Sequence, residues 1–367
     1  MKLKILVLAN DGVGLYNFRK ELLEELIRQG HTVTISLPLN NCISKLKNIG
    51  CQYIETVIDR RGTNPMKDLS LLTAYFRMIR KVRPDLVLTY TVKPNIYGGM
   101  ACRILKTPYI SNITGLGTSI ENDGLLRILV IFLYRVGLKK SSCIFFQNSP
   151  NRDLFISKHI VREKNTRVIP GSGVNLDQHR FEEYPEESHR IVFLYIGRMM
   201  KEKGIDELLQ ASARVKEICA EVQFDLIGEC EEDYQARLQE ASQSGIINYY
   251  GYSEDVHSFI RKSNAILLPS YHEGTSNVLL ESAASGRPVL ASKVTGCLET
   301  FDEGISGLGF EAKDARSLEN AILNFIKLPY EKKKMMGIAG RRKMEIEYDR
   351  RMVIRSYLSE INRISGN

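Results

Sequence analysis

Short apolar runs alternate with amphipathic segments of helix length along most of this chain of 367 residues. In the first half, the strand-like runs cover residues 4–9, 32–37, 85–90, 109–112, 143–147 and 167–169. The helix-like segments between them cover residues 15–28, 69–82, 96–105 and 125–138. Strands that alternate with helices of this length form βαβ units around a parallel sheet. The chain is therefore expected to have an α/β fold.

A second alternating series follows a polar stretch at 171–190, which lacks periodicity and is expected to link two domains. Its strand-like runs cover residues 191–196, 222–227, 248–250, 265–268 and 289–292, and its helix-like segments cover 205–220, 234–244, 256–261 and 277–284. The chain length suits two domains of about 180 residues. The predicted domains span residues 1–172 and 190–345, and a charged helical segment follows at 346–367.

The composition, with 43% hydrophobic and 26% charged residues, is that of an ordinary globular protein. The seven cysteines are scattered and lack Cys-x-x-Cys spacing, which favours reduced thiols and a cytoplasmic location over disulfides or a zinc site. The apolar segment at 5–9 is too short for a signal peptide and is interpreted as the first strand. The apolar run at 128–133 is too short to span a bilayer, so we expect no integral membrane protein.

The expected strand–loop–helix unit that begins at 265–268 contains two glutamates. Glu273 falls in the loop after this strand, and Glu281 falls in the helix expected at 277–284. Open α/β sheets bind ligands at the carboxyl ends of their strands. We therefore expect both carboxylates to border a ligand crevice.

The start of this helix carries several residues that favour helix N-termini. Thr275, Ser276 and Asn277 are all good N-cap candidates. The N–H groups of residues 275–278 are expected to be free, because the first turn of a helix has no internal acceptors for them. Free amides at a helix N-terminus form a ready anion site.

The Glu-Gly-(six residues)-Glu pattern at 273–281 resembles the signature of retaining glycosyltransferases of the GT-B architecture and family 4 type. The segments 286–292 and 296–300 are also similar to that family, and in particular to bacterial capsule, lipopolysaccharide and lipid-linked oligosaccharide transferases. The resemblance implies two Rossmann-like domains with parallel sheets that face across a cleft. It implies an acceptor domain first, a nucleotide-sugar domain second, and a last helix, 346–367, that packs back on the first domain.

By this resemblance, Glu273, Arg198 and Lys203 are the expected catalytic residues. Arg198 and Lys203 match the residues that hold the donor diphosphate, where fixed cations stabilise the charge of a departing nucleoside diphosphate. Glu273 matches the residue that contacts the transferred sugar, where positive charge develops in an oxocarbenium-like transition state. Glu281 matches the residue that accepts hydrogen bonds from the ribose.

The expected donor site collects residues from several loops. Glycines after the first strand let the backbone approach a ligand closely, and the turns at 228–229 and 250–256 match loops that border the nucleotide. The predicted donor-binding residues are Gly12, Gly14, Arg198, Lys203, Glu229, Tyr252, Val256, Glu273, Gly274, Thr275, Ser276, Asn277, Val278 and Glu281.

The acceptor is expected to contact the first domain. Lys93 is a candidate for an acceptor phosphate, and Thr114 or Gly115 stands where many relatives carry a histidine that touches the donor sugar. A Gly-Leu-Gly at 115–117 is shared with the capsule branch. The predicted acceptor-binding residues are Tyr16, Asn17, Arg19, Lys93, Asn95 and Thr114.

No metal or separate cofactor is expected. The six histidines lack metal-ligand spacing, and the chain contains no Asp-x-Asp motif. The substrate is expected to be a nucleotide sugar, with UDP as the favoured nucleotide. The acceptor is expected to be a lipid-phosphate-linked saccharide.

Charge is unevenly distributed along the chain. Residues 1–175 contain 26 Lys and Arg but only 12 Asp and Glu. The remainder of the chain contains 25 Lys and Arg and 31 Asp and Glu. No nucleic-acid motif accompanies the basic half, so we expect peripheral binding to an anionic membrane surface, at the inner face of the plasma membrane. The segment 125–140 combines apolar and basic residues and is either a sheet-covering helix or a membrane-inserted one.

Three other functions fit parts of the pattern. A transferase could use another nucleotide sugar, such as a GDP-sugar, and a soluble acceptor. An NAD-dependent oxidoreductase would need the Gly-x-Gly-x-x-Gly fingerprint, which fails because residue 17 is Asn. A non-catalytic scaffold of the same fold would not need Glu273, Arg198 and Lys203.

Overall fold

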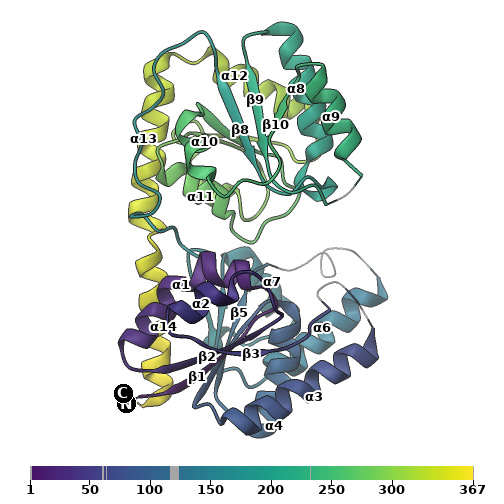
Figure 1. The fold of residues 1–367 in the computed structure, drawn as a ribbon, viewed down its shortest axis with the longest axis vertical. Helices are drawn as coiled ribbons and strands as arrows, with labels where there is room; N and C mark the ends of the chain where they lie inside the picture. The colour runs from purple at the N-terminus through teal and green to yellow at the C-terminus, as the bar shows by residue number, and fades with distance from the viewer. Residues whose placement is uncertain (1, 60–61, 63, 116–123, 232, 367) are drawn as a thin grey trace. The chain divides into compact units, whose positions relative to one another are not determined.

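The computed structural model describes residues 2–59, 62, 64–115, 124–231 and 233–366 (Figure 1). The chain forms two compact units. The first comprises Met1–Ser172 with Met352–Asn367, and the second comprises Gly173–Arg351. Each unit has its own parallel sheet and its own hydrophobic core residues. The α/β fold with two Rossmann-like, parallel-sheet units is thereby confirmed.

The first unit is built on a seven-stranded parallel sheet in the order β3-β2-β1-β4-β5-β6-β7. Its strands are β1 (Lys4–Leu8), β2 (Thr32–Leu37), β3 (Gln52–Glu55), β4 (Leu86–Tyr90), β5 (Tyr109–Ile113), β6 (Cys143–Phe146) and β7 (Thr166–Val168). Successive strand residues point to opposite faces, so Val7 lies in one core and Leu6 and Leu8 lie in the other. Because β1 lies between β2 and β4, its carboxyl end is a topological switch point.

Helices cover both faces of this sheet (Figure 1). One core contains side chains of the sheet and of α1 (Gly12–Arg28), α2 (Ile43–Asn48) and α14 (Arg350–Ser365). The other contains side chains of α3 (Pro65–Val82), the π-helical turn Pro94–Gly98, α4 (Gly99–Leu105), α6 (Leu125–Leu138) and α7 (Ser149–Ser157). The sheet is therefore buried on both sides, as its apolar strands require.

The last helix, α14, contributes to the core of the first unit from Val353 onward. Tyr357 is fully buried, and its hydroxyl accepts a hydrogen bond from Asn112 Nδ2 of β5. Arg363 donates to the Ser142 carbonyl at 2.9 Å. These contacts attach the C-terminal segment of the first unit to residues at and near its sheet.

The second unit is built on a six-stranded parallel sheet in the order β10-β9-β8-β11-β12-β13. Its strands are β8 (Val192–Ile196), β9 (Gln223–Ile227), β10 (Asn248–Tyr249), β11 (Ala265–Leu268), β12 (Val289–Ser292) and β13 (Gly307–Phe310). Its helices are α8 (Ile205–Ile218), α9 (Gln235–Gln243), α10 (Val256–Lys262), α11 (Asn277–Ala284), α12 (Ala315–Lys327) and α13 (Tyr330–Glu347). Figure 1 shows α8, α9 and α12 on one side of this sheet and α10, α11 and α13 on the other.

The stretch 171–190 was expected to link two domains, but most of it is part of the second unit. Residues from 173 onward belong to the second unit, where the Tyr184 hydroxyl donates to the Asn264 carbonyl at 3.0 Å. The guanidinium of Arg287 donates to the carbonyls of Glu182 and Glu183 at 3.0 and 2.8 Å. Arg287 is fully buried, and burial lowers its pKa to about 10. Side-chain hydrogen bonds therefore fix a segment that has no regular secondary structure of its own.

Two further properties bear on the class of protein. The described residues include all seven cysteines, and none of these forms a disulfide. Among the described helices, none combines the length and the apolar character that crossing a bilayer requires.

Candidate functional site

Lys203 and Glu273 form an ion pair at the switch point of the second sheet. β8 lies between β9 and β11, so the chain leaves the carboxyl ends of β8 and β11 in opposite directions, which is where open α/β sheets bind ligands. Lys203 follows β8 and Glu273 follows β11, and Lys203 Nζ lies 2.5 Å from Glu273 Oε1. Their side chains are 20% and 16% exposed, so both remain partly accessible. The structure thus brings together two of the three predicted catalytic residues.

Backbone contacts hold these two loops against each other. The Tyr271 N–H donates to the Glu202 carbonyl at 2.9 Å. Gly204 has φ +71°, and a Cβ there would lie 2.1 Å from the Pro269 carbonyl oxygen. Only glycine can therefore occupy this position without moving the loop that carries Glu273.

The N-terminus of α11 differs from the sequence prediction. Ser276 caps the helix by accepting a hydrogen bond from the Leu279 N–H. However, the Ser276 N–H is not free, because it donates to the Gly296 carbonyl at 2.8 Å. The predicted set of free amides at 275–278 is therefore wrong for Ser276. Asn277 and Val278 supply the first-turn N–H groups of α11.

Arg198, the third predicted catalytic residue, has a different partner. Its guanidinium nitrogen lies 2.9 and 2.8 Å from the two carboxylate oxygens of Glu231. The Arg198 side chain is 45% exposed, so this pair is open to solvent. Sequence reasoning did not identify Glu231, which stands among four acidic residues at 229–233 and has no distinguishing pattern.

The predicted base-binding turns follow β9 and β10 on the same edge of the sheet. The Gly228 N–H donates to the Gly251 carbonyl at 2.8 Å, and a Cβ at Gly228 would lie 1.8 Å from the Gly197 oxygen. Glu229 is exposed, and its carbonyl accepts from the Met199 N–H at 2.7 Å. Tyr252 is 65% exposed, and Val256 begins α10. The turns after β8, β9 and β10 are thus tied together by backbone hydrogen bonds.

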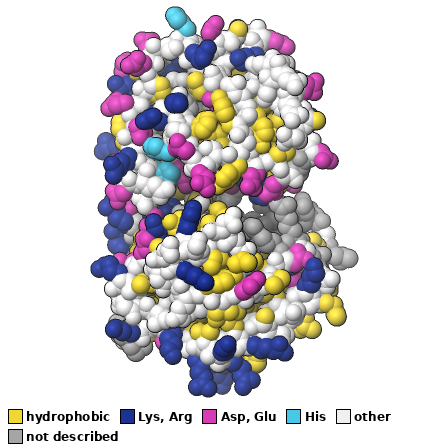
Figure 2. Space-filling model, in the orientation of Figure 1, with side chains coloured by type: hydrophobic (Ala, Val, Ile, Leu, Met, Phe, Trp, Pro, Cys, Tyr) yellow, Lys and Arg dark blue, Asp and Glu magenta, His cyan; other side chains and the backbone are white. Residues whose placement is uncertain are grey.

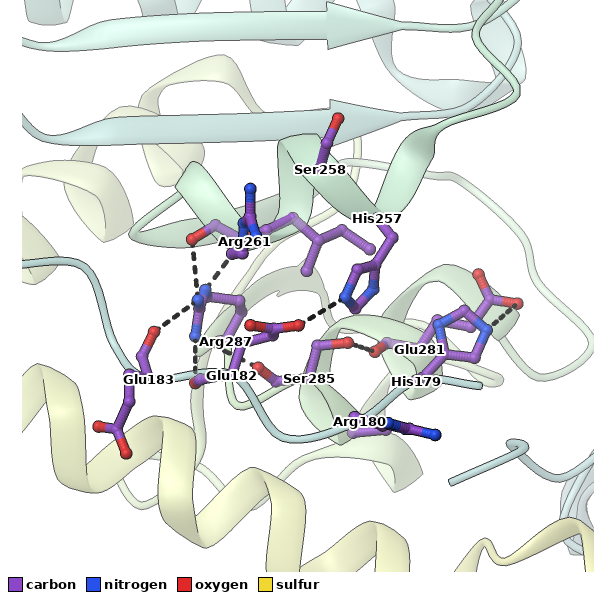
Figure 3. Close-up of polar contacts among 12 residues, drawn as sticks. His179, Arg180, Glu182, Glu183, His257, Ser258, Arg261, Glu281, Ser285 and Arg287 are labelled. Carbon is purple, nitrogen blue, oxygen red and sulfur yellow. Dashed lines mark hydrogen bonds and ion pairs between the residues drawn. The ribbon is translucent and has the colours of Figure 1, made fainter. Parts of the chain in front are cut away.

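Glu281, in the middle of α11, lies in a polar cluster (Figure 3). Its side chain is 23% exposed, and His179 Nε2 lies 3.9 Å from its Oε1. Burial raises the pKa of Glu281 to about 7, although the positive charge of Arg350 acts in the opposite direction. Sequence reasoning missed His179 because it lies in the stretch expected to be a linker.

In the first unit, the predicted glycines lie inside the first turn of α1. The Asp11 carboxylate caps this helix by accepting from the N–H groups of Val13 and Gly14, at 3.3 and 3.0 Å. A Cβ at Gly12 would lie 2.3 Å from the Asn40 side chain. These amides are therefore occupied by a carboxylate of the chain itself.

Three predicted acceptor residues are engaged inside the first unit. Lys93 Nζ pairs with Asp68 Oδ1 at 2.7 Å. Asn95 is fully buried, and its amide donates to the Asn112 carbonyl at 2.8 Å. Arg19 is 4% exposed, and its guanidinium carbon lies 5.5 Å from the centroid of the Tyr90 ring. In this structure, the side chains of these three residues therefore make contacts within the unit itself.

The remaining predicted acceptor residues are accessible. Asn17 is exposed on α1, and Tyr16 and Thr114 are partly buried. The ammonium groups of Lys20 and Lys45 lie 5.6 and 5.7 Å from the Tyr16 ring centroid. Of the Gly-Leu-Gly at 115–117, only Gly115 lies within the described residues. Within those residues, no group of three His, Cys, Asp or Glu side chains could hold a metal ion.

Comparison with protein-family models gives one match for each half of the chain. Residues 4–148 match the model described as "Glycosyl transferase 4-like". Residues 177–343 match the model described as "Glycosyl transferases group 1". The two matches fall in different compact units and together cover both sheets.

Individual relatives are distant but match over long stretches. The chain is 25% identical, over 100% of both chains, to the N,N'-diacetylbacillosaminyl-diphospho-undecaprenol alpha-1,3-N-acetylgalactosaminyltransferase of Campylobacter jejuni. It is 22% identical to the capsular polysaccharide biosynthesis glycosyltransferase CapM of Staphylococcus aureus, over 84% of each chain. The crystal structure of Anabaena HepE in complex with UDP and glucose matches with a TM-score of 0.78 at 16% identity, covering 98% of this chain and 99% of HepE.

Proposed function

The chain belongs to the GT-B glycosyltransferases, and on that basis we propose that it transfers a sugar from a nucleotide sugar to a lipid-linked saccharide in bacterial surface polysaccharide synthesis. The family assignment made from the sequence is confirmed by both family models. The proposed donor is a UDP-linked hexose or N-acetylhexosamine, and the proposed reaction retains the anomeric configuration. The names of the C. jejuni and S. aureus relatives support the acceptor class and the pathway.

The observation that carries this proposal is the Lys203–Glu273 ion pair at the switch point of the second sheet. A cation and a carboxylate lie together there, and α11 begins at Asn277, shortly after Glu273 in the chain. A glycosyl transfer develops negative charge on the leaving diphosphate and positive charge near the sugar ring. Lys203 can balance the negative charge of the diphosphate, and Glu273 can balance the positive charge near the sugar ring.

In the proposed donor complex, Lys203 leaves Glu273 and binds the diphosphate. Arg198 likewise leaves Glu231 and binds the diphosphate. Glu273 is then available to the hydroxyls of the sugar and to the charge on its ring. The bond from the anomeric carbon to the phosphate oxygen breaks, and a bond to the acceptor oxygen forms on the same face. The acceptor proton passes to the leaving phosphate. These cations and helix amides supply the counter-charge, so the proposed mechanism needs no divalent metal.

The proposed acceptor contacts in the first unit are Tyr16, Asn17 and Thr114, which are accessible. Arg19, Lys93 and Asn95 would support them from inside the unit rather than touch the acceptor. Because a lipid-linked acceptor remains in the bilayer, we propose that the protein works in the cytoplasm at the inner face of the plasma membrane.

An exposed surface of α4 and α6 supports this location. Ile104, Leu126, Ile128, Leu129 and Phe132 are 43–65% exposed. Arg103, Lys106, Lys139 and Lys140 are exposed basic residues on or beside the same two helices. Figure 2 shows Lys and Arg side chains close to exposed hydrophobic ones on the visible face of this unit. Apolar side chains flanked by cations suit an anionic lipid surface.

The proposal is tested by measuring release of the nucleoside diphosphate from a panel of UDP- and GDP-sugars, with and without a polyprenyl-diphosphate saccharide. Glu273→Gln should reduce turnover about a hundredfold or more, as expected for the loss of one transition-state electrostatic contact. Glu217→Gln, an exposed glutamate on α8, is the matched control and should keep full activity. Retention is checked by comparing the anomeric NMR coupling of donor and product. Full activity of the Glu273→Gln variant would refute the site.

A further inference from the structure

A tyrosine side chain joins the two segments that carry Lys203 and Glu273. Tyr271 stands two residues before Glu273 in the loop after β11. Its side chain is buried, and its hydroxyl donates to the carboxylate of Glu207, with the two oxygens at 2.8 and 2.9 Å. Glu207 is in the first turn of α8, four residues after Lys203. The Tyr271 side chain therefore links the loop of Glu273 to the helix that follows Lys203.

The Tyr271 phenol is a fixed hydrogen-bond donor. Burial, together with the hydrogen bond to Glu207, raises the pKa of Tyr271, so the phenol keeps its proton at neutral pH. A carboxylate acceptor makes this hydrogen bond stronger than one between neutral groups. The ammonium group of Lys313 lies over the ring at 5.0 Å from its centroid, within the range of a cation–π contact. The ring is thus held by an anion at its hydroxyl and by a cation over its face.

The backbone on both sides of Tyr271 is held as well. The Ser292 hydroxyl of β12 donates to the Ser270 carbonyl. Further along, a Cβ at Gly296 would lie 2.5 Å from the Glu273 carbonyl oxygen, so the backbone of Glu273 packs directly against that turn. These contacts fix the loop to β12 and to the turn after it. The Tyr271 side chain adds the contact that reaches α8.

This link becomes important when the Lys203–Glu273 ion pair is open. In the proposed donor complex, Lys203 binds the diphosphate and no longer holds Glu273. The hydrogen bond from Tyr271 to Glu207 uses neither of these two charges, so it can persist while they are apart. Because a misplacement of about 1 Å can cost about a hundredfold in rate, a second link between the two segments has a direct effect on catalysis.

We propose that Tyr271 is a positioning residue that holds Glu273 in place for sugar transfer through its hydrogen bond to Glu207. This inference rests on the proposed function, in which Glu273 acts on the transferred sugar. In that complex, Tyr271 acts through the loop in which it stands and does not touch the donor. Its loss should therefore lower the rate of transfer but not the affinity for UDP, because UDP carries no sugar for Glu273 to contact.

The test measures kcat with the nucleotide sugar that the donor panel identifies, and the Kd of UDP by calorimetry. Tyr271→Phe removes only the hydroxyl, so kcat should fall about tenfold to a hundredfold while the Kd of UDP stays unchanged. Glu207 also lines an open cavity of about 400 Å³, so water can hydrate its carboxylate and the variant should remain folded. Glu207→Ala should lower kcat as much as Tyr271→Phe does. Glu207→Gln keeps an oxygen that accepts from the phenol and should retain most of the wild-type kcat.

Tyr234→Phe is the matched control. The Tyr234 hydroxyl donates to Asp206, the residue before Glu207 on α8, at 2.9 Å, but Tyr234 caps α9 and does not belong to the Glu273 loop. Its variant should keep the wild-type kcat. The double variant Tyr271→Phe with Glu207→Ala should be no slower than the slower single variant, because both changes remove the same hydrogen bond.

Three results would overturn the positioning role of Tyr271 alone. They are a wild-type kcat in Tyr271→Phe, an equal loss of kcat in Tyr271→Phe and Tyr234→Phe, and a loss of UDP affinity in Tyr271→Phe as large as its loss of kcat. The last two would show a general structural role instead. A wild type that turns over none of the UDP- and GDP-sugars would overturn the proposed function itself, and with it this inference.

Discussion

Lys203 Nζ and Glu273 Oε1 are 2.5 Å apart, and each is contributed by a different loop of the second sheet. The two charges neutralise each other, and both side chains are mostly shielded from water. In the proposed donor complex, the donor separates the two side chains, and the diphosphate takes the place of Glu273 as the partner of Lys203. The proposal makes the same exchange at Arg198 and Glu231, which are more exposed.

The first prediction concerns the energetic coupling of this pair. Lys203→Met leaves the Glu273 carboxylate in the crevice without its counter-charge, so it should be destabilising. The double variant Lys203→Met with Glu273→Gln removes both charges and should recover part of that loss. We expect a coupling free energy of about 0.5–3 kcal/mol from urea denaturation of the four proteins. Additive single-variant effects would show that the two charges do not interact.

The second prediction distinguishes the role of Arg198 in UDP binding from the role of its partner, Glu231. Arg198→Ala should weaken UDP binding, because a diphosphate contact is lost. Glu231→Gln releases Arg198 from its ion pair, so UDP binding should be unchanged or tighter. Calorimetry on both variants tests this. Equal weakening in the two would mean that UDP binding depends on the intact Arg198–Glu231 pair rather than on a released Arg198.

The sequence predicted the elements nearest the site well, because their patterns are local. The strand at 265–268 and the helix at 277–284 have the predicted bounds, since an apolar run and a Ser-Gly helix end specify them. The short α2 and β3 were missed, because β3 is only partly buried and its strand pattern is weak. The helical segment expected at 346–367 is α14, which begins at Arg350 after a break at Tyr348 and Asp349 that separates it from α13.

Partners far apart in the chain could not be predicted. Arg19 was expected at the acceptor, but the Tyr357 ring centroid lies 6.0 Å from its guanidinium carbon, and Tyr357 stands 338 residues later. Asp68 similarly pairs with Lys93, and nothing in either local sequence indicates it. Residue type showed which side chains can bind an anion, but only tertiary packing decides which cations are already neutralised.

The third prediction is that transfer does not require a divalent metal. Lys203, Arg198 and the first-turn amides of α11 provide the positive counterpart to the leaving diphosphate in the proposed mechanism. Activity in excess EDTA should match activity in buffer within about twofold. An activity that EDTA abolishes and magnesium or manganese restores would contradict the proposed mechanism.

The fourth prediction follows from the pKa of Glu281, which burial raises from 4.5 to about 7. The folded protein then holds a proton between these values that the unfolded chain has lost, so this residue lowers stability as pH rises from about 4.5 to 7. Glu281→Gln should therefore be more stable than the wild type at pH 8, by about 3 kcal/mol at most. The difference should shrink towards pH 5.

Thermal denaturation of wild type and variant at several pH values measures this difference, and Glu217→Gln controls for the substitution itself. The affinity for UDP should fall in Glu281→Gln if Glu281 faces the ribose as predicted, because a neutral amide then replaces the carboxylate that would accept from a ribose hydroxyl. A stability difference that does not change between pH 5 and 8 would show that Glu281 is ionised throughout this range.

The last prediction concerns the exposed surface of α4 and α6. Each basic residue near an anionic leaflet contributes about 1 kcal/mol, so the four cations there should support reversible binding to vesicles that contain phosphatidylglycerol. Binding should fall steeply between 0.1 M and 1 M salt, because the Debye length shrinks from about 10 Å to about 3 Å. Vesicles of neutral lipid should bind much less.

Co-sedimentation with both kinds of vesicle tests this, and two variants locate the surface. Lys139→Gln with Lys140→Gln should weaken binding to anionic vesicles, whereas Lys327→Gln with Lys332→Gln makes the same charge change in the second unit and should not. Phe132→Ser should weaken the salt-resistant part of binding, because its side chain is 57% exposed and apolar. Equal binding to anionic and neutral vesicles, or equal loss in the two lysine pairs, would show that this surface does not face the membrane.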